Sequence, residues 1–169
     1  MANLSKYLFG KPLPDPVTSN QKTPMVLDIL LDADALVALS KTDDTNHSKA
    51  VQISNYLQEE GAIFYISPFT ISEVVTVLSY KVSHQAAKKF LKEVRKLALP
   101  LLQLPKESIA LADDWFIKQS SKKRISYPDC YNMALLDKYQ NQLQAIFSFD
   151  QIYPKNGFKL AENLLKLSD

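Results

Sequence analysis

The sequence predicts a three-layer α/β/α sandwich around a mostly parallel central sheet, and two observations lead to this fold class. Short apolar runs alternate along the chain with longer segments in which apolar residues recur at helical spacing. The clearest runs are VLDILL at 26–31, AIFYIS at 62–67 and QAIFSF at 144–149. Runs this apolar are typical of strands that are buried on both faces, as in a parallel sheet covered by helices.

The segments between these runs are predicted to be helices. They cover residues 44–60, 69–80, 84–98, 106–120 and 128–139. The second of them is preceded by Ser67-Pro68, a typical N-cap followed by proline at the first helical position. Its apolar residues from Ile71 to Leu78 follow at i, i+3, i+4 and i+7, which indicates one buried face.

The two ends of this pattern are less regular. Residues 1–24 contain four prolines and the polar stretch VTSNQKT, and they are predicted to form an extended arm. Residues 25–169 are expected to form one domain, because the whole chain has about the length of a single domain. The run LPLLQL at 99–104 is a further candidate strand, which Pro100 would confine to an edge of the sheet or shorten.

Composition excludes several classes of protein. Cys130 is the only cysteine, so neither an intrachain disulfide nor a multi-cysteine zinc site can form. No apolar run approaches the roughly 20 residues of a membrane span, and the N-terminal residues lack the apolar block of a signal peptide. We therefore expect a cytoplasmic protein. Its 20 basic and 18 acidic residues leave a net charge of +2, which says little about partners.

Four acidic residues stand where a predicted strand has just ended or a helix has just begun. They are Asp32, Glu73, Asp129 and Asp150. In an alternating α/β chain such positions collect along one edge of the sheet, where ligand sites usually form. Two carboxylates about 4 Å apart repel by about 4 kcal/mol at an effective dielectric constant of 20. A divalent metal ion would offset this repulsion, so the pattern predicts a metal-dependent phosphoryl-transfer site.

Each of these acids also has a local explanation. Asp32 could cap the helix that follows it, and Glu73 has the spacing of a capping box with Thr70. Asp129 fits the first turn of a helix, where the helix dipole favours an acid, and Asp150 could begin a turn. The local explanations do not account for four such acids at the strand exits of one small sheet.

From Met25 to about Gly157 the chain resembles a PIN domain, and most closely the small VapC-type toxins. The motifs that carry the resemblance occur in order as LLDADALVAL, DDTNHSKA, SPFTISEVV, RISYPDCYNMAL and IFSFD. The resemblance implies that Asp32, Glu73, Asp129 and Asp150 hold one or two Mg²⁺ or Mn²⁺ ions and cleave RNA. It further implies a type II toxin with a possible antitoxin partner, and a homodimer that pairs through helices 69–80 and 84–98.

The chain departs from the family pattern after its first acid. Ala33 and Asp34 stand where the family usually has Thr or Ser and then Asn or Ser. Ser148 keeps a hydroxyl that is common in the family. We expect Asp34 and Ser148 to lie directly behind the metal ligands, where they would tune the affinity for the ion.

A basic loop and an aromatic residue precede Asp129 and are candidates for RNA binding. They are Lys122, Lys123, Arg124 and Tyr127. The cations could contact phosphates, and the tyrosine could stack on a base or simply pack.

Two other functions remain open at this point. One is a catalytically silent PIN-like module that binds RNA or a protein. The other is a haloacid dehalogenase-like phosphatase in which Asp32, of the sequence Asp32-Ala33-Asp34, is the nucleophile. That family needs a later acidic motif just beyond a strand, whereas Asp113-Asp114 fall inside a predicted helix, so the phosphatase is disfavoured.

Overall fold

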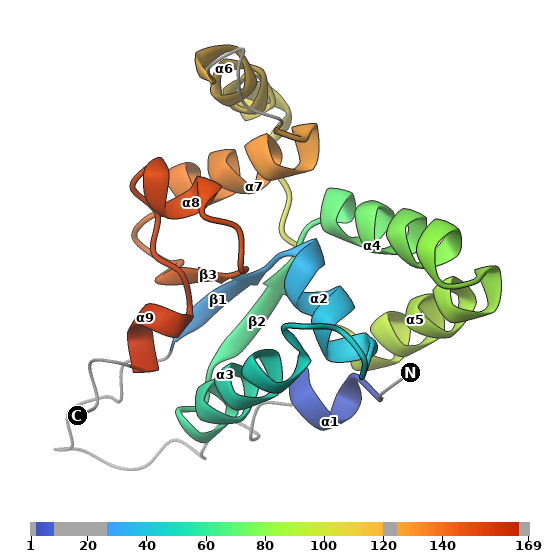
Figure 1. The fold of residues 1–169 in the computed structure, drawn as a ribbon. Helices are drawn as coiled ribbons and strands as arrows, with labels where there is room; N and C mark the ends of the chain where they lie inside the picture. The colour runs from blue at the N-terminus through green and yellow to red at the C-terminus, as the bar shows by residue number, and fades with distance from the viewer. Residues whose placement is uncertain (1–2, 9–26, 120–124, 166–169) are drawn as a thin grey trace, which may run out of the picture.

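The computed structural model describes residues 3–8, 27–119 and 125–165. Within them, short strands alternate with helices (Figure 1). The elements are α1 (Ser5–Leu8), β1 (Asp28–Leu31), α2 (Ala33–Ser40), α3 (His47–Glu59), β2 (Ile63–Ile66), α4 (Pro68–Lys81), α5 (His84–Leu97), a 3₁₀ turn (Lys106–Ser108), α6 (Ala110–Lys118), α7 (Tyr127–Lys138), β3 (Ala145–Phe147), α8 (Ile152–Lys155) and α9 (Glu162–Leu165).

The sheet is parallel and has the strand order β2-β1-β3. One isolated bridge joins Leu101 to Ile66 beyond β2, and another joins Leu160 to Ile146 beyond β3. The strand predicted at 99–104 does pair beside β2 at the edge of the sheet, but it is shortened to the single bridge at Leu101. Pro100 has no N–H to donate, so only its carbonyl joins the pairing, accepting from the N–H of Ile66 at 3.1 Å.

Alternate residues of each strand enter two separate cores. Ile29 and Leu31 of β1 pack among α1 to α5, whereas Leu30 between them packs among α6 to α8. The side chains of β2 and β3 alternate in the same way. Figure 1 shows these two groups of helices on opposite sides of the sheet. The three-layer α/β/α sandwich predicted from the sequence is confirmed.

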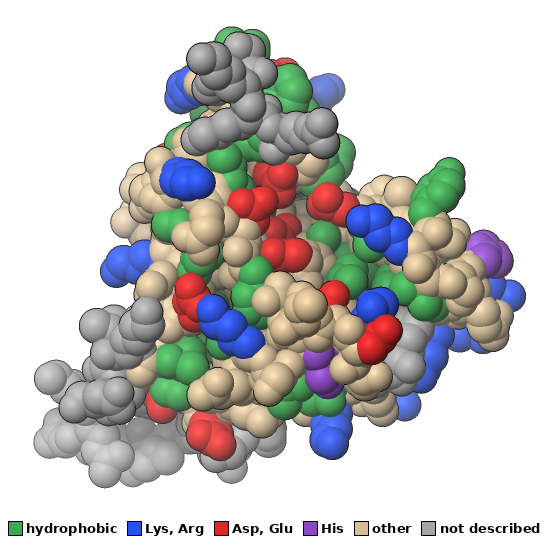
Figure 2. All heavy atoms as spheres, in the orientation of Figure 1, with side chains coloured by type: hydrophobic (Ala, Val, Ile, Leu, Met, Phe, Trp, Pro, Cys, Tyr) green, Lys and Arg blue, Asp and Glu red, His purple; other side chains and the backbone are tan. Residues whose placement is uncertain are grey.

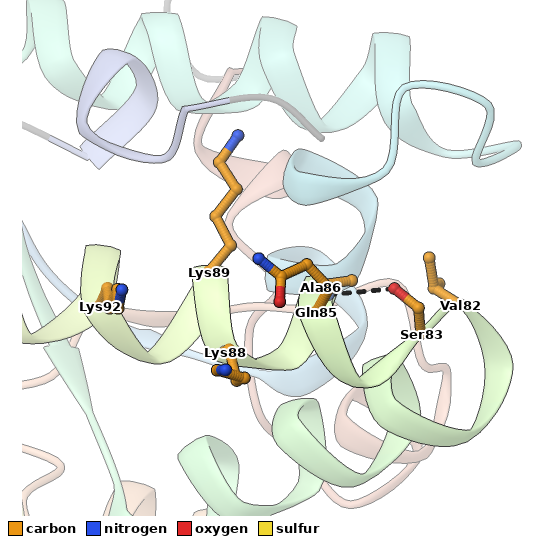
Figure 3. A pocket seen from close by; sticks show the side chains of 7 residues that line it. All are labelled: Val82, Ser83, Gln85, Ala86, Lys88, Lys89 and Lys92. Atoms are coloured by element: carbon orange, nitrogen blue, oxygen red, sulfur yellow. Dashed lines mark hydrogen bonds between the residues drawn. The ribbon is translucent and has the colours of Figure 1, made fainter.

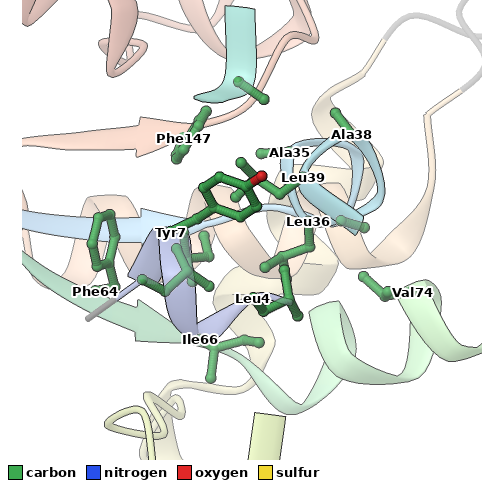
Figure 4. Packing of buried hydrophobic residues seen from close by; sticks show 14 of the residues in the cluster. Leu4, Tyr7, Ala35, Leu36, Ala38, Leu39, Phe64, Ile66, Val74 and Phe147 are labelled. Atoms are coloured by element: carbon green, nitrogen blue, oxygen red, sulfur yellow. The ribbon is translucent and has the colours of Figure 1, made fainter. Parts of the chain in front are cut away.

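The N-terminal residues correct one expectation. Residues 1–24 were expected to be extended, but Ser5–Leu8 form the helix α1, and Leu4 is fully buried in the core beside α2 and β2 (Figure 4). The backbone N–H of Leu4 donates to Glu93 Oε2 at 3.0 Å, and Ser54 Oγ donates to the carbonyl of Tyr7. Residues 9–24 of the predicted arm lie outside the described residues.

The helices predicted at 44–60, 69–80, 84–98 and 128–139 are observed with shifted ends as α3, α4, α5 and α7. The helix predicted at 106–120 is observed as the 3₁₀ turn followed by α6, which ends at Lys118, and Ile109 between the two has helical backbone angles. Ser67 caps α4 and Pro68 opens it, as the sequence predicts. No described helix is long and apolar enough to cross a membrane.

Candidate metal centre

The sheet brings the ends of two acid-bearing strands together. β1 and β3 are parallel neighbours, so Asp32, which follows β1, and Asp150, which follows β3, leave the same edge of the sheet. The backbone N–H of Asp32 donates to the carbonyl of Phe147 at 3.1 Å, which continues the pairing to the last residue of β3. Glu73 reaches this edge from the second turn of α4, and Asp129 reaches it from the first turn of α7.

The four acids line one cavity of about 400 Å³. Its walls are formed by Asp32, Ala33, Asp34, Glu73, Ile125, Ser126, Asp129 and Asp150. Figure 2 shows acidic side chains gathered in a hollow near the centre of the view. Asp34 adds a fifth carboxylate to the four that the sequence singles out.

Asp32 is the most enclosed of these acids, with 3% of its surface exposed. Its Oδ1 accepts hydrogen bonds from the backbone N–H of Ala33 at 2.8 Å and from Asn132 Nδ2 at 3.0 Å. Burial raises the pKa of the Asp32 carboxyl well above its usual value, and the charges of Asp34 and Asp129 raise it further. The predicted cap is present, because Asp32 is the N-cap residue of α2.

Asn132 is a site residue that the sequence analysis missed. It is fully buried, and its Oδ1 accepts from Ser67 Oγ at 3.1 Å while its amide donates to Asp32. Thr70 Oγ1 lies 3.3 Å from the same amide nitrogen, which connects α4 to this network. One signal was available: Asn132 is the polar exception in a buried stretch from Cys130 to Leu136, and lies one helical turn after an acid.

Asp129 has both of the roles that its sequence position suggests. Its Oδ2 accepts from the backbone N–H of Ser126 at 3.0 Å and from Ser126 Oγ at 2.8 Å, which completes the capping box of α7. Its Oδ1 lies 3.4 Å from the hydroxyl of the buried Tyr153, which donates to it. The capping bonds hold the carboxylate in place while it lines the cavity.

Asp34 and Asp150 are connected through the segment after β3. Asp34 Oδ2 accepts from the backbone N–H of Phe149 at 2.8 Å and from Ser148 Oγ at 3.1 Å. Ser148 Oγ in turn accepts from the N–H of Asp150 at 3.0 Å, and Asp150 Oδ1 accepts from the N–H of Ile152 at 2.8 Å. Burial raises the pKa of Asp34 to about 6 against these hydrogen bonds, which lower it, and the charge of Asp150 adds to the increase.

Glu73 does not form the capping box that its spacing to Thr70 suggests. The N-cap of α4 is Ser67, whose Oγ accepts from the N–H of Thr70 at 3.0 Å, so Thr70 is already inside the helix. Glu73 follows one turn later and turns its carboxyl into the cavity. Burial raises its pKa to about 7, with smaller contributions from the charges of Asp129 and Asp34.

Two unpaired oxygens indicate what the cavity could accept. Asp34 Oδ1 and Glu73 Oε2 are buried, and neither has a hydrogen-bond partner among the described residues. A cation would give both oxygens a partner and would offset the repulsion that raises these pKa values. Oxygen donors of this kind suit a hard divalent ion such as Mg²⁺ or Mn²⁺. In the part of the chain that the structure describes, however, no three His, Cys, Asp or Glu side chains form a ready-made ligand set.

A model of the PIN domain matches residues 29–159 of the chain. The chain belongs to the PIN-domain family. Among solved structures, it is similar to VapC20 (Rv2549c) of Mycobacterium tuberculosis, described as a sarcin-ricin loop cleaving toxin. The two share 19% sequence identity with a TM-score of 0.66, over 77% of this chain and 95% of that one. No curated protein sequence matches the chain.

The RNA-binding candidates of this PIN domain are only partly visible. Lys122, Lys123 and Arg124 lie outside the described residues. Tyr127 is the first residue of α7, and its hydroxyl donates to Asp113 Oδ1 at 2.7 Å. Asp113-Asp114 lie within α6, as predicted, so the PIN domain does not place them beyond a strand as a phosphatase of the haloacid dehalogenase type would require.

A second hollow of this PIN domain, of about 430 Å³, has a separate set of lining residues, none of which lines the acidic cavity. It is formed by the turn between α4 and α5 and by the first turns of α5, with Lys88, Lys89 and Lys92 among its residues (Figure 3). No carboxylate lines it. The acidic cavity is therefore the better candidate for a metal-dependent site.

Proposed function

We propose that the protein is a metal-dependent endoribonuclease whose metal ligands are Asp32, Glu73, Asp129 and Asp150. The observation that supports this most is the single cavity that these four carboxylates share with Asp34 at the carboxyl edge of the sheet. Membership of the PIN family supports a nuclease-type role for such a cavity.

One or two Mg²⁺ or Mn²⁺ ions held there would activate a water molecule for attack on phosphorus and stabilise the charge on the leaving oxygen. The chain itself fixes the ligands: Asn132 orients Asp32, and Ser126 orients Asp129. Ser148 and the N–H of Phe149 hold Asp34 behind them. Burial raises the pKa of Glu73 to about 7 in the ion-free cavity, and a bound cation would favour the ionised form that can serve as a ligand.

In the overall reaction water adds to the phosphorus while the bond to the 3′ oxygen breaks. The products are a 5′-phosphate and a 3′-hydroxyl, and the proton lost by the water balances the one gained by the leaving oxygen. VapC20, which this chain resembles in fold, is described as a toxin that cleaves the sarcin-ricin loop. We propose on that basis an RNA substrate, a role as the toxin of a type II pair with an antitoxin partner, and a cytoplasmic location.

The homodimer expected from the family resemblance also stays a proposal. The apolar residues of α4 and α5 that suggested it pack inside the chain, where Val74, Leu78, Phe90 and Val94 belong to the core. The outer side of α5 instead carries lysines (Figure 3). A dimer through this hairpin would need contacts other than its buried apolar face.

Replacing Asp129 with asparagine tests the function, because the two roles of this residue then separate. The amide keeps the volume and an oxygen that can cap α7, so the free energy of unfolding should change by only a few tenths of a kcal/mol to about 1 kcal/mol. If Asp129 is a ligand, Mg²⁺- or Mn²⁺-dependent cleavage of RNA should collapse. Asp114→Asn, on the exposed side of α6, is the matched control and should cleave normally.

Addition of EDTA should abolish cleavage by the wild-type protein, and end-group analysis should find 5′-phosphates. Undiminished metal-dependent cleavage by Asp129→Asn would refute its assignment as a ligand. A wild-type protein that binds RNA but never cleaves it with either ion would favour the catalytically silent PIN-like module instead.

A further inference from the structure

Three aromatic side chains from three helices lie side by side next to the acidic cavity. Phe69 is in the first turn of α4, Phe116 is in the last turn of α6, and Tyr127 begins α7. The ring centroids of Phe69 and Tyr127 are 5.8 Å apart, and those of Phe116 and Tyr127 are 6.2 Å apart. We refer to Phe69, Phe116 and Tyr127 as the aromatic strip.

The aromatic strip begins where the cavity ends. Phe69 precedes Glu73 by four residues, so both side chains lie on the same face of α4. Tyr127 directly follows Ile125 and Ser126, which line the cavity. Hydrophobic side chains adjoin the acidic cluster in Figure 2. A molecule bound in the cavity can therefore extend over the strip.

The strip is exposed at its surface and fixed from behind. Phe69 is 36% exposed and Phe116 is 46% exposed, whereas the core phenylalanine Phe90 is fully buried. Behind the strip, the buried ring of Tyr131 packs on Phe69 with centroids 4.4 Å apart. The hydrogen bond from the Tyr127 hydroxyl to Asp113 holds the middle ring. Rings held in this way lose little conformational freedom when they bind a planar ligand.

We propose that the aromatic strip stacks an unpaired base of an RNA whose neighbouring phosphate lies in the acidic cavity. This inference rests on the proposed ribonuclease function and adds to it a base-binding subsite beside the acidic cavity. The five carboxylates of the cavity repel phosphates except at a bound cation, so an uncharged contact beside the cavity adds affinity that this repulsion does not reduce. Stacking on aromatic rings supplies such a contact with any base, provided that the face of the base is free. The favoured substrate therefore has unpaired bases next to the scissile bond, and an uninterrupted duplex is a poor substrate.

Binding to a fluorescent RNA tests the strip without requiring cleavage. The probe is a short unstructured RNA in which 2-aminopurine replaces one adenine, mixed with the Asp129→Asn protein so that the RNA stays intact. Stacking should quench the probe. In the same background, Phe116→Leu or Tyr127→Leu should weaken binding by about fivefold or more and remove the quenching. Tyr127→Phe keeps the ring and loses only the hydroxyl, so it should retain most of both signals.

Tyr80→Leu is the matched control, because Tyr80 is an exposed aromatic residue on the same helix as Phe69. It lies eleven residues further along α4, which is about 16 Å at the rise of an α-helix. This variant should bind like its parent. In the cleavage-competent protein, Phe116→Leu should raise KM for unstructured RNA and leave kcat nearly unchanged. Thermal melting of each variant reports whether the fold is retained. Phe116 is more exposed than Tyr127, so its replacement by leucine should disturb the fold less.

The outcomes separate this inference from the ribonuclease proposal. If the wild-type protein cleaves RNA but Phe116→Leu and Tyr127→Leu behave like Tyr80→Leu in binding and in KM, the stacking role is overturned and the nuclease stands. If the strip binds and quenches the probe but no RNA is cleaved with Mg²⁺ or Mn²⁺, the nuclease proposal fails and the stacking role stands. If the probe does not bind at all, the stacking role is overturned, and cleavage by the wild-type protein decides the nuclease proposal on its own. Unchanged RNA binding together with loss of a dimer in Phe116→Leu would assign the strip to protein contact instead.

Discussion

In the metal-free protein at neutral pH, Asp34 should destabilise the fold, and replacing it with asparagine should relieve this. Its Oδ2 accepts two hydrogen bonds, from Phe149 and Ser148, but its Oδ1 is buried without a partner among the described residues. An asparagine keeps the volume, and its amide oxygen can accept the same two bonds. Its NH₂ group would replace the unpaired oxygen and remove one negative charge from beside Asp32 and Asp150.

The size of the effect follows from the pKa of Asp34. Burial raises this pKa from 3.8 to about 6, so the folded protein binds the proton more tightly than the unfolded chain does. The contribution of Asp34 to stability is therefore highest below about pH 4 and is lost as the pH rises through about 6. The difference of about 2.2 pH units, at about 1.36 kcal/mol per unit, corresponds to about 3 kcal/mol. Glu73, with a pKa raised to about 7, acts in the same direction, although solvent screening at this half-buried side chain reduces its share.

Urea unfolding in EDTA, between about pH 4.5 and pH 8, measures this directly. Relative to wild type, Asp34→Asn should become more stable as the pH rises, by about 2 kcal/mol between pH 4.5 and pH 8, because about 1 kcal/mol of the total is already lost at pH 4.5. Asp114→Asn, at an exposed position on α6, should follow the wild-type profile. Added Mg²⁺ should stabilise the wild-type protein more than Asp34→Asn, because the ion offsets a repulsion that the variant lacks. If the difference in free energy of unfolding between the two proteins stays constant with pH, the reasoning is refuted, because Asp34 would then have the same pKa in the folded and the unfolded protein.

Three further predictions concern the support of the site and the assembly of the chain. Asn132→Ala removes the amide that donates to the buried carboxylate of Asp32, so chemical denaturation should show that the free energy of unfolding falls by about 1–3 kcal/mol. The control is Asn141→Ala at an exposed position, and an equal loss of stability in the two variants would contradict the role of Asn132. Leu4→Ala should cost about 2–5 kcal/mol, because Leu4 is fully buried, whereas Leu101→Ala at a half-exposed position should cost much less. If the two leucine variants unfold alike, α1 is not part of the core in solution. Light scattering at micromolar concentration should give the mass of a dimer, and a monomer mass would count against the proposed homodimer.

The fold could be predicted from the sequence because burial on both faces leaves a direct mark on a strand. The runs ending at Leu31, Ile66 and Phe147 are apolar at almost every position, and each alternates between the two cores of the sandwich. The starts of α4 and α7 could also be predicted from the sequence, because Ser67 and Ser126 cap these helices through hydrogen bonds to residues only three positions away. Interactions this short depend on little besides the neighbouring residues.

The features that the sequence did not predict all depend on distant partners. Asn132 stands out locally as a polar residue in a buried stretch, but its partner Asp32 lies 100 positions away and no local pattern identifies it. α1 has four residues, which is too short to be stable alone, and it exists through packing of Leu4 and Leu8 against a core assembled elsewhere. The apolar pattern at 99–104 overstated the length of the pairing, since only Pro100 and Leu102, on either side of the bridge residue Leu101, form hydrogen bonds with Ile66.

The local and the functional explanations of the cavity acids turn out to be compatible. A carboxylate has two oxygens and about four lone-pair directions, so one oxygen can hold a turn while the other remains available to a ligand. Asp34 shows this division clearly, with Oδ2 bound to the segment after β3 and Oδ1 unpaired. Asp129 and Asp150 likewise fix a helix start and a turn while their side chains line the cavity. Because the capping bonds restrict the rotamers of these side chains, a bound cation would meet donors that are already oriented, and less ordering entropy would oppose its binding. The acids that stabilise the helix start and the turns at this edge of the sheet are thus the same acids that offer oxygen ligands to an ion.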